Sequence, residues 1–518
     1  MSPDAAPLQP DACYLALKAR DARFDGCFFT GVTSTGIYCR PVCRVRTPKP
    51  ENCRFFRHAA QAESAGFRPC LRCRPELAPH SVVWSIQDAS YILAHQAARL
   101  LEDPEAGDGG APSVEQLAAR LGVSTRHLRR IFEAQFGVSP VQYLQTRRLL
   151  AAKQLLADTD LAITQVALAS GYASVRRFNA AFLEHYGLNP TRLRREGAPR
   201  PAQGMAIRLG YRPPYDVHAM LDFFGKRAIP GIEFVDGAGH ATGRTLSIES
   251  GGRWHRGWLL AEFHEDRHQV ALRVSDSLRE ALPAVIHRLR AALDLDADPQ
   301  AINSVLHASF PHGDGLRVPG AMSGYELAVR AVLGQQVTVA AARTLAQRLV
   351  DRFGEPIATP FAQLTRLFPE PAVLACAGGD DLGRLGIVRQ RQAAIVAIAQ
   401  AVAGKRLQLH GGADVQATIA ALRQMPGIGD WTAQYIAMRA LRWPDAFPAG
   451  DVALQKALAV QGSGNPAHAA QTASQAWKPW RSYAVVRAWA QPSTPVDCPV
   501  MPDSWSPPRT AILPKECS

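Results

Sequence analysis

Two closely spaced pairs of cysteines place the strongest constraint on how this chain can fold. Cys39 and Cys43 lie in GIYCRPVC, and Cys70 and Cys73 lie in FRPCLRC. Two such pairs separated by a longer loop match a four-thiolate zinc site. A segment of this length buries little apolar surface, so a bound metal would supply stability that its core cannot. The pattern predicts one Zn2+ held by four cysteines, and from the spacing alone a purely structural zinc site is the simpler interpretation.

The length and charge of the chain indicate several domains and an acidic partner. With 518 residues the chain is too long for one ordinary core, and its length predicts roughly three or four domains. The formal net charge of +13 makes nucleic acid the natural partner. The N-terminus has no basic region followed by an apolar one, and no apolar run approaches a membrane span. We therefore expect a cytoplasmic protein without membrane contact.

One helical pattern occurs twice between residues 113 and 182. In the first copy Ser113 opens a capping box, Gly122 supplies the turn and Ser124 can cap a second helix; in the second copy Gly171 supplies the turn. A single match is more often an ordinary helical hairpin, but two matches joined by a helix over 140–158 favour a DNA-binding domain. The arginines expected to face a major groove are Arg126, Arg129, Arg130, Arg176 and Arg177.

The stretch Leu422–Asp451 reads LRQMPGIGDWTAQYIAMRALRWPDAFPAGD and suggests an enzyme acting on DNA. A short turn, Pro426-Gly427-Ile428-Gly429, separates two helical patterns. Such a turn presents backbone N–H groups at a helix N-terminus, which suits a phosphate. A carboxylate at Asp451 could then act on the nucleotide attached to that phosphate. Taken alone, however, an Asp after a loop is more often a helix N-cap.

The cysteine segment resembles the N-terminal domain of Ada-type adaptive-response proteins over about residues 10–80. The resemblance rests on GIYCRPVC, the FRPC-x-x-C pair and the spacing between them. It implies that all four cysteines bind zinc and that Cys39 accepts a methyl group from a methylphosphotriester in DNA. Methylation would remove one negative charge from a site that otherwise repels phosphate, so DNA affinity should rise. A zinc-containing regulator without methyl transfer is the alternative for this segment.

Four arginines near these cysteines, Arg40, Arg44, Arg46 and Arg72, are candidate phosphate contacts. For any one of them a solvated surface arginine is an equally good interpretation. Cys13, Cys27 and Cys53 fall outside the pattern, and we interpret them as ordinary core or surface residues.

The repeated helical pattern resembles the AraC-type DNA-binding domain over about residues 85–196. The closing segment GYASVRRFNAAFLEHYGLNPTRLR carries this resemblance. In Ada-type proteins such a domain follows the zinc domain, so the two resemblances agree. They imply operator DNA and RNA polymerase as partners. The Pro-Cys-His-Arg motif of the second methyltransferase in longer Ada proteins does not occur in the chain, so we expect no demethylation of guanine O6.

Residues 205–492 resemble AlkA-type 3-methyladenine DNA glycosylases of the helix-hairpin-helix superfamily. The motifs are RPPYDVHAMLDFF, RVPGAMSGYELAVRAVLGQQVTVAAA, MPGIGDWTAQY and WKPWRSYAVVRAW. The resemblance implies that the hairpin Pro426–Gly429 binds a phosphate, with a monovalent cation at its carbonyls. Asp451 falls at the position of the catalytic carboxylate. It would stabilise oxocarbenium character on the sugar, or position water.

The same resemblance predicts a base pocket with electron-rich walls. Phe223, Trp431, Tyr435 and Trp489 match aromatic positions on which a flipped base could stack, and a positively charged alkylated base favours such ring faces. Buried core aromatics are the alternative interpretation. Two departures leave the base preference open. Gln336 stands where the AlkA type places an apolar wedge, and Ala490 replaces a Tyr.

Two further positions refine the expected mechanism. Glycosylases that also cut the strand carry a Lys where this chain has Trp431, so we expect a monofunctional glycosylase that leaves an abasic site. Only Cys498 and Cys517 follow Asp451, so we expect no iron–sulfur cluster.

Together these observations predict a multidomain chain that is mainly α with α+β parts. The expected domains are a zinc-bound α+β domain (1–80), an all-α double helix-turn-helix domain (85–196), an α+β domain with a small antiparallel sheet (205–298), an all-α helix-hairpin-helix domain (299–492) and a disordered Pro-rich tail (493–518). We expect a bacterial, nucleoid-associated monomer that repairs alkylated double-stranded DNA and activates transcription. The alternative is a regulator whose second half binds DNA without catalysis.

Overall fold

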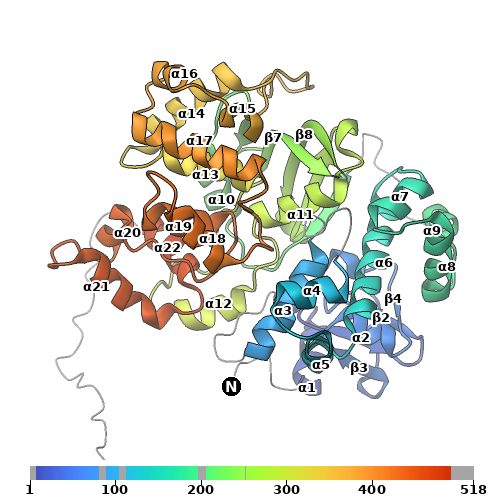
Figure 1. The fold of residues 1–518 in the computed structure, drawn as a ribbon. Coiled ribbons are helices and arrows are strands. Elements are labelled where there is room, and N and C mark those ends of the chain that lie inside the picture. The colour runs from blue at the N-terminus through green and yellow to red at the C-terminus, as the bar shows by residue number, and fades with distance from the viewer. Residues whose placement is uncertain (1–7, 81–88, 104–111, 197–205, 251, 492–518) are drawn as a thin grey trace, which may run out of the picture.

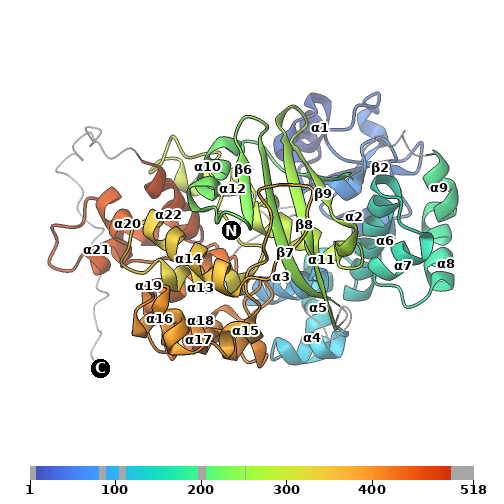
Figure 2. The same cartoon turned by 90° about the horizontal axis from the view of Figure 1, so that it is seen from above.

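The computed structural model describes residues 8–80, 89–103, 112–196, 206–250 and 252–491. The linker predicted at 197–204, the predicted tail, Cys498 and Cys517 lie outside these ranges. Within them, no helix combines the length and the apolar character that a membrane crossing requires. The described chain is mostly helical and contains two sheets, which confirms the predicted fold class (Figures 1 and 2).

The N-terminal region is a small α+β unit built around a four-stranded sheet. Its elements are α1 (Pro10–Ala19), β1 (Phe29–Val32), β2 (Ile37–Cys39), β3 (Cys53–Phe56), α2 (Ala59–Ser64) and β4 (Arg68–Pro69). The strand order is β3-β1-β2-β4. The edge strand β4 runs parallel to β2, with Tyr38 opposite Pro69. This pairing places the end of β2, at Cys39, beside the residue that follows β4, Cys70.

The next region is all-α and contains both predicted helix-turn-helix units. Its helices are α3 (Ala89–Glu102), α4 (Val114–Arg120), α5 (Thr125–Phe136), α6 (Pro140–Asp158), α7 (Ile163–Ala169), α8 (Val175–Tyr186) and α9 (Pro190–Glu196). Ser113 Oγ accepts a hydrogen bond from Gln116 N at 3.2 Å, as the capping box predicts. Gly122 and Gly171 have φ of +66° and +79°, the left-handed conformation that the two turns require.

A five-stranded antiparallel sheet opens the second part of the chain. Its elements are β5 (Ala206–Gly210), α10 (Val217–Arg227), β6 (Glu233–Asp236), β7 (Ala241–Ser250), β8 (Arg253–His264), β9 (Gln269–Val274) and α11 (Leu282–Ala292), and the strand order is β5-β9-β8-β7-β6. In β9 buried and half-buried residues alternate, so one face of the sheet packs on a core. That core is shared with α6 to α9 of the helix-turn-helix region.

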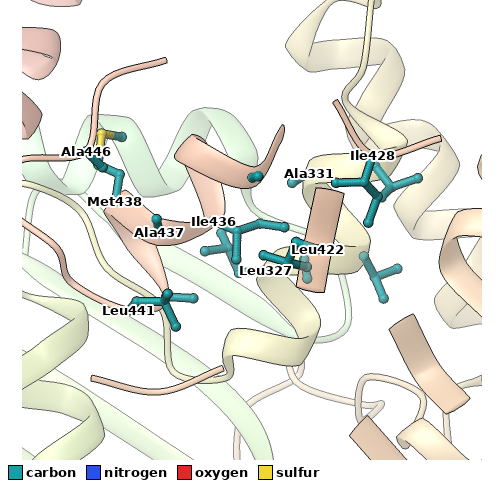
Figure 3. Packing of buried hydrophobic residues seen from close by; sticks show 14 of the residues in the cluster. Leu327, Ala331, Leu422, Ile428, Ile436, Ala437, Met438, Leu441 and Ala446 are labelled. Atoms are coloured by element: carbon teal, nitrogen blue, oxygen red, sulfur yellow. The ribbon is translucent and has the colours of Figure 1, made fainter. Parts of the chain in front are cut away.

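The remaining described residues form an all-α region with its own core. Its helices are α12 (Pro299–Leu306), α13 (Gly324–Leu333), α14 (Val339–Phe353), α15 (Pro371–Ala375), α16 (Gly379–Arg384), α17 (Arg389–Ala403), α18 (Val415–Arg423), α19 (Asp430–Arg439), α20 (Val452–Ala457), α21 (Pro466–Ala473) and α22 (Arg481–Ala490). Helix α13 is buried along almost its whole length. Its Leu327 and Ala331 lie close to Leu422, Ile428 and Ile436 of the α18–α19 hairpin (Figure 3). This packing anchors the α18–α19 hairpin on helix α13.

Candidate active sites

The four predicted zinc ligands meet at one point. The Sγ atoms of Cys39, Cys43, Cys70 and Cys73 all lie within 4.8 Å of one another. Three of these cysteines are buried and Cys73 is half-buried. A backbone hydrogen bond from Cys70 N to Tyr38 O, 2.9 Å long, joins the two pairs. Four sulfur ligands at such separations match the tetrahedral set that Zn2+ prefers.

The thiolate form of these cysteines would require a cation nearby. Hydrogen bonds with Cys43 and Cys70 raise the pKa of Cys39 far above its ordinary value when no metal is present. Several thiolates cannot share so small and buried a space without a positive charge between them. A divalent metal would remove that obstacle and hold Cys39 as a thiolate. The residues therefore fit the four-cysteine zinc site of the predicted domain.

One of the four arginines predicted to contact phosphate is buried. Arg40 is only 6% exposed. Its guanidinium forms an ion pair with Asp25, and its Nη1 donates to Cys73 O at 2.9 Å. The prediction of a phosphate contact was therefore wrong for Arg40, because its charge is neutralised inside the protein. Arg44, Arg46 and Arg72 are exposed, and their contact with DNA stays a prediction.

The five arginines predicted for DNA reading lie on the two second helices of the helix-turn-helix units, and all are exposed. Arg126, Arg129 and Arg130 are on α5, and Arg176 and Arg177 are on α8. Inward residues of the same helices, such as Phe132 and Phe178, are fully buried. Arg129 has a long contact of 3.8 Å with Glu115, which is weak at the surface. These side chains are free to contact DNA, and their individual roles stay predictions.

Asp451 takes one of the two roles considered from the sequence, that of a helix N-cap, and its catalytic role stays a prediction. It is the N-cap of α20, since its Oδ1 accepts a hydrogen bond from Leu454 N at 2.8 Å. It also accepts two indole hydrogen bonds. Trp431 Nε1 donates to Oδ2 at 2.9 Å, and Trp489 Nε1 donates to Oδ1 at 3.1 Å. Three N–H donors thus hold the carboxylate in one orientation.

Two of the four aromatic residues predicted for the base pocket contact this carboxylate, and the other two join them through ring contacts and an arginine. The rings of Trp431 and Tyr435 stack, with centroids 5.3 Å apart and planes 17° apart. Trp489 lies with its centroid 6.3 Å from that of Tyr435. All three rings are half-buried, so one face of the cluster stays accessible. Phe223 joins the cluster through Arg439, whose Cζ is 4.8 Å from the Phe223 ring and 5.3 Å from the Tyr435 ring.

Two arginines, Arg439 and Arg227, contact the aromatic cluster, and no sequence motif predicted them. Arg439 is buried, and its Nη1 donates to Tyr435 Oη at 2.5 Å. Burial alone would raise the pKa of Tyr435, but Arg439 and Arg227 together hold it below its ordinary value. Arg227 Cζ lies 3.7 Å from the centroid of the Phe223 ring. The Phe223 ring is therefore already in contact with a guanidinium cation. This contact weakens the expectation that the ring attracts a positively charged base.

The hairpin presents the backbone at the start of α19. Gly427 has φ of +74°, and a Cβ there would lie 3.1 Å from Gln390 O. Gly429 is the N-cap of α19 and has no side chain to cover the first turn, so N–H groups there can receive a phosphate. Pro426 and Gly429 are exposed, whereas Ile428 is buried and anchors the turn.

The predicted wedge residue lies on a turn tied to the hairpin. Gln336 is exposed, with φ of +53°, between α13 and α14. The neighbouring Gln335 donates from Nε2 to Gly427 O and to Thr432 Oγ1, both at 2.9 Å. The turn and the hairpin therefore form one surface. Sequence reasoning missed Gln335, because only the fold brings residues 335 and 427 together.

Four family models match consecutive parts of the chain. They are described as "Metal binding domain of Ada" (residues 12–76), "Helix-turn-helix domain" (117–196), "AlkA N-terminal domain" (206–323) and "HhH-GPD superfamily base excision DNA repair protein" (329–482). The first covers the four cysteines, and the last covers the hairpin and Asp451 but ends before Trp489.

Relatives match either the whole chain or one half of it. A Mycobacterium tuberculosis protein, named as a probable bifunctional transcriptional activator/DNA repair enzyme AlkA, is 38% identical over 502 residues, which cover 94% of this chain and 97% of the relative. DNA-3-methyladenine glycosylase 2 of Escherichia coli is 32% identical over 281 residues, covering 54% of this chain and 95% of the relative. The activator and repair enzyme AdaA of Bacillus subtilis is 35% identical over 191 residues, covering 36% of this chain and 84% of the relative.

Proposed function

Because the chain belongs to the family of bifunctional transcriptional activator/DNA repair enzymes represented by the Mycobacterium tuberculosis relative, we propose that it carries two repair chemistries. One is removal of alkylated bases of the 3-methyladenine type, and the other is transfer of a methyl group from a DNA methylphosphotriester to the protein. The second chemistry also serves as a signal for transcription activation. The residues that we assign to the two reactions are Asp451 and Cys39.

Base removal breaks the bond between C1′ of the sugar and a nitrogen of the damaged base. The electron pair leaves with the base, and the sugar acquires oxocarbenium character. The Asp451 carboxylate stabilises this positive charge, since its orientation is set before the reaction by Trp431, Trp489 and Leu454 N. Water then adds to C1′ and loses a proton. The products are the free base and an abasic site in DNA.

Two features support a glycosylase that does not cut the strand. The residue two positions after Gly429 is Trp431, which has no amine to form a Schiff base with the sugar. Its indole N–H instead donates a hydrogen bond to Asp451.

Two further elements bind the DNA around the lesion in this proposal. The exposed turn at Pro426–Gly429 binds the phosphate next to the lesion, with a monovalent cation at its carbonyls. Gln336 fills the gap that the flipped base leaves.

Methyl transfer at the cysteine cluster is a direct displacement. Cys39 Sγ attacks the methyl carbon of the methylphosphotriester, a sulfur–carbon bond forms, and the carbon–oxygen bond breaks. The phosphate leaves as the ordinary diester anion. Zinc, when bound by Cys39, Cys43, Cys70 and Cys73, supplies the positive charge that keeps a thiolate nucleophilic. The Cys39 thiolate becomes a neutral thioether, so the protein surface near Arg44, Arg46 and Arg72 repels phosphate less.

The partners of this activity are double-stranded DNA and the transcription machinery. Helices α5 and α8 present their exposed arginines to successive major grooves, and RNA polymerase is the expected partner of an activator bound there. The chain acts as a monomer in this proposal. The relatives reported above are bacterial, which agrees with a nucleoid-associated protein of the bacterial cytoplasm.

The geometry of Asp451 carries the proposal for base removal. A helix N-cap requires one hydrogen bond from the backbone, whereas Asp451 also receives two indole donors from the predicted base pocket. The substitution Asp451→Asn tests this reasoning, because Asn is an equally good N-cap but carries no charge. Release of 3-methyladenine should fall by about 100- to 1000-fold, while binding of undamaged duplex and the melting temperature change little. Base release at the wild-type rate would favour the alternative, a regulator whose second half only binds DNA.

A further inference from the structure

A fully buried arginine lies between two parts of the chain. We call the described residues 8–80, 89–103 and 112–196 the sensor half, and 206–250 and 252–491 the glycosylase half. Arg212, in the glycosylase half, is 0% exposed. Its Nε donates to Asp25 O at 2.7 Å, and its Nη2 donates to Pro79 O at 3.1 Å and to His80 O at 2.9 Å. Its Nη1 donates to Asp296 O at 3.0 Å and to Ala297 O at 3.1 Å.

All five N–H groups of this guanidinium are therefore used, three of them on the sensor half. An arginine has five donors in a fixed planar arrangement, and a buried donor without a partner is costly. The carbonyls that satisfy Arg212 come from three separate segments, around Asp25, His80 and Asp296. They take the required positions only when the two halves are in contact.

The two halves also approach closely near Arg212. A Cβ on Gly210, in the glycosylase half, would lie 2.3 Å from Leu77 O in the sensor half. A Cβ on Gly26, in the sensor half, would lie 3.0 Å from Arg212 Nη2. The first contact excludes any side chain larger than hydrogen, and the second leaves a side chain little room. Such close packing is typical of a specific interface and not of two domains that are connected only by a flexible linker.

Two further polar contacts extend the interface. His80 N donates to Asp296 Oδ1 at 2.8 Å, and Asp296 is also ion-paired with Arg290. At the other end, the buried Asp103 of the sensor half contacts His410 Nδ1 at 3.1 Å from its Oδ2. Together with the shared apolar core between α6 to α9 and the sheet, these contacts cover both domains of the sensor half.

We propose that the sensor half and the glycosylase half are specific non-covalent partners, joined through an interface centred on Arg212. The two halves stay together without the peptide link between Glu196 and Ala206. As a consequence, Cys39 and Asp451 belong to one body, and the glycosylase half keeps a fixed orientation relative to any DNA that the helix-turn-helix domain binds. This inference does not depend on which bases the glycosylase half releases.

The experiment starts from the full-length chain, cuts it between the two halves, and measures whether the halves stay associated. A protease recognition sequence is inserted between Glu196 and Ala206, the purified protein is cleaved, and the fragments are separated by gel filtration over a dilution series. We expect the wild-type fragments to elute as one complex. We expect Arg212→Met to weaken their association by on the order of 30- to 100-fold, because five carbonyls, three of them in the sensor half, lose the donors that Arg212 supplies. Its fragments should elute separately at dilutions where the wild-type complex persists.

Matched variants separate the interface from general misfolding. Arg267→Met removes an exposed arginine of the same domain, one that pairs with Asp266, and should leave the complex intact. Circular dichroism and base release before cleavage report the fold. If Arg212→Met lowers them, Asp103→Ala, which alters only the sensor half, replaces it and should weaken association by about tenfold. The proposal is overturned if the wild-type fragments separate on cleavage, or if neither interface variant dissociates more readily than Arg267→Met.

Discussion

The cysteine cluster and the group of residues around Asp451 each hold acidic side chains in a defined arrangement, but they are assembled differently. The four cysteines lie between residues 39 and 73, and a short parallel strand pairing brings them together. Asp451 obtains its partners from residues 20 and 38 positions away, on helices α19 and α22. The cluster is therefore a local structure with a metal requirement, while the pocket is a product of the whole helical domain.

The two sites also differ in what a negative charge there requires. Crowded thiolates need a cation, and removing one ligand changes the nature of the site. A single carboxylate needs only oriented hydrogen-bond donors. Removing one donor should weaken the positioning of the carboxylate only in part, because the other donors remain. Substitutions at the first site should consequently act in an all-or-none way, and substitutions at the second should be graded.

The largest effect is expected at the cysteine that accepts the methyl group. Cys39→Ser should abolish methyl transfer completely, since a neutral hydroxyl does not replace a thiolate as nucleophile. Mass spectrometry after incubation with methylphosphotriester DNA measures this, and the wild-type protein should carry one added methyl group on Cys39. Cys53→Ser, outside the cluster, is the control and should be methylated normally. A methyl group on Cys70 or Cys73 in place of Cys39 would contradict the choice of acceptor.

A large loss of stability is expected when the ion pair beneath the cluster is broken. Arg40→Met leaves Asp25 buried and unpaired, which should lower the free energy of unfolding of the sensor half by about 3–5 kcal/mol. Arg44→Met, at an exposed arginine four positions further along the chain, should change it by less than about 0.5 kcal/mol. Chemical denaturation of both variants measures the difference. Equal stabilities would mean that the Arg40–Asp25 pair does not form.

A graded effect is expected at the pocket. Trp489→Phe keeps the aromatic ring but removes the N–H that donates to Asp451 Oδ1. Loss of one charge-assisted hydrogen bond should lower kcat for base release by about tenfold, while the Kd for undamaged duplex stays constant. Trp431→Phe, which removes the donor to Oδ2, should act similarly. Single-turnover kinetics with a large excess of enzyme gives the rate, and an unchanged rate in both variants would exclude a positioning role for the indoles.

The smallest effect is expected from acid, at two histidines that lie outside both sites. The rings of His58 and His95 both pack near Phe136, with centroids 4.9 and 5.0 Å from that of Phe136, and burial lowers their pKa values to about 4 and about 3. The unfolded chain therefore binds more protons than the folded one below pH 6.5, so stability falls as the pH drops from 6.5 towards 4. The melting temperature at pH 5 should lie below that at pH 7.5. His58→Gln should reduce this difference, and a melting temperature that rises in acid would contradict the prediction.

Much of the local structure was predictable because local rules decide it. The linking helix was expected over 140–158 and α6 spans Pro140–Asp158. Capping by Ser113 and the turns at Gly122 and Gly171 follow from side-chain hydrogen bonds and glycine conformation. The zinc site also follows from spacing, because the two cysteine pairs each place ligands within one turn. Burial of Arg40 did not follow, since its partner Asp25 lies in another segment.

The sequence by itself determined which chemical groups this protein uses: four thiols at fixed spacing, a glycine hairpin, a carboxylate after a loop, and aromatic residues in known motifs. Their identities are set by covalent order and short-range geometry. The tertiary structure decided what surrounds them. It placed two indole donors on Asp451, a guanidinium on the Phe223 ring, and Arg212 between the two halves. Such contacts join residues that are far apart in the chain, and only the packing of helices and sheets brings them within hydrogen-bonding distance.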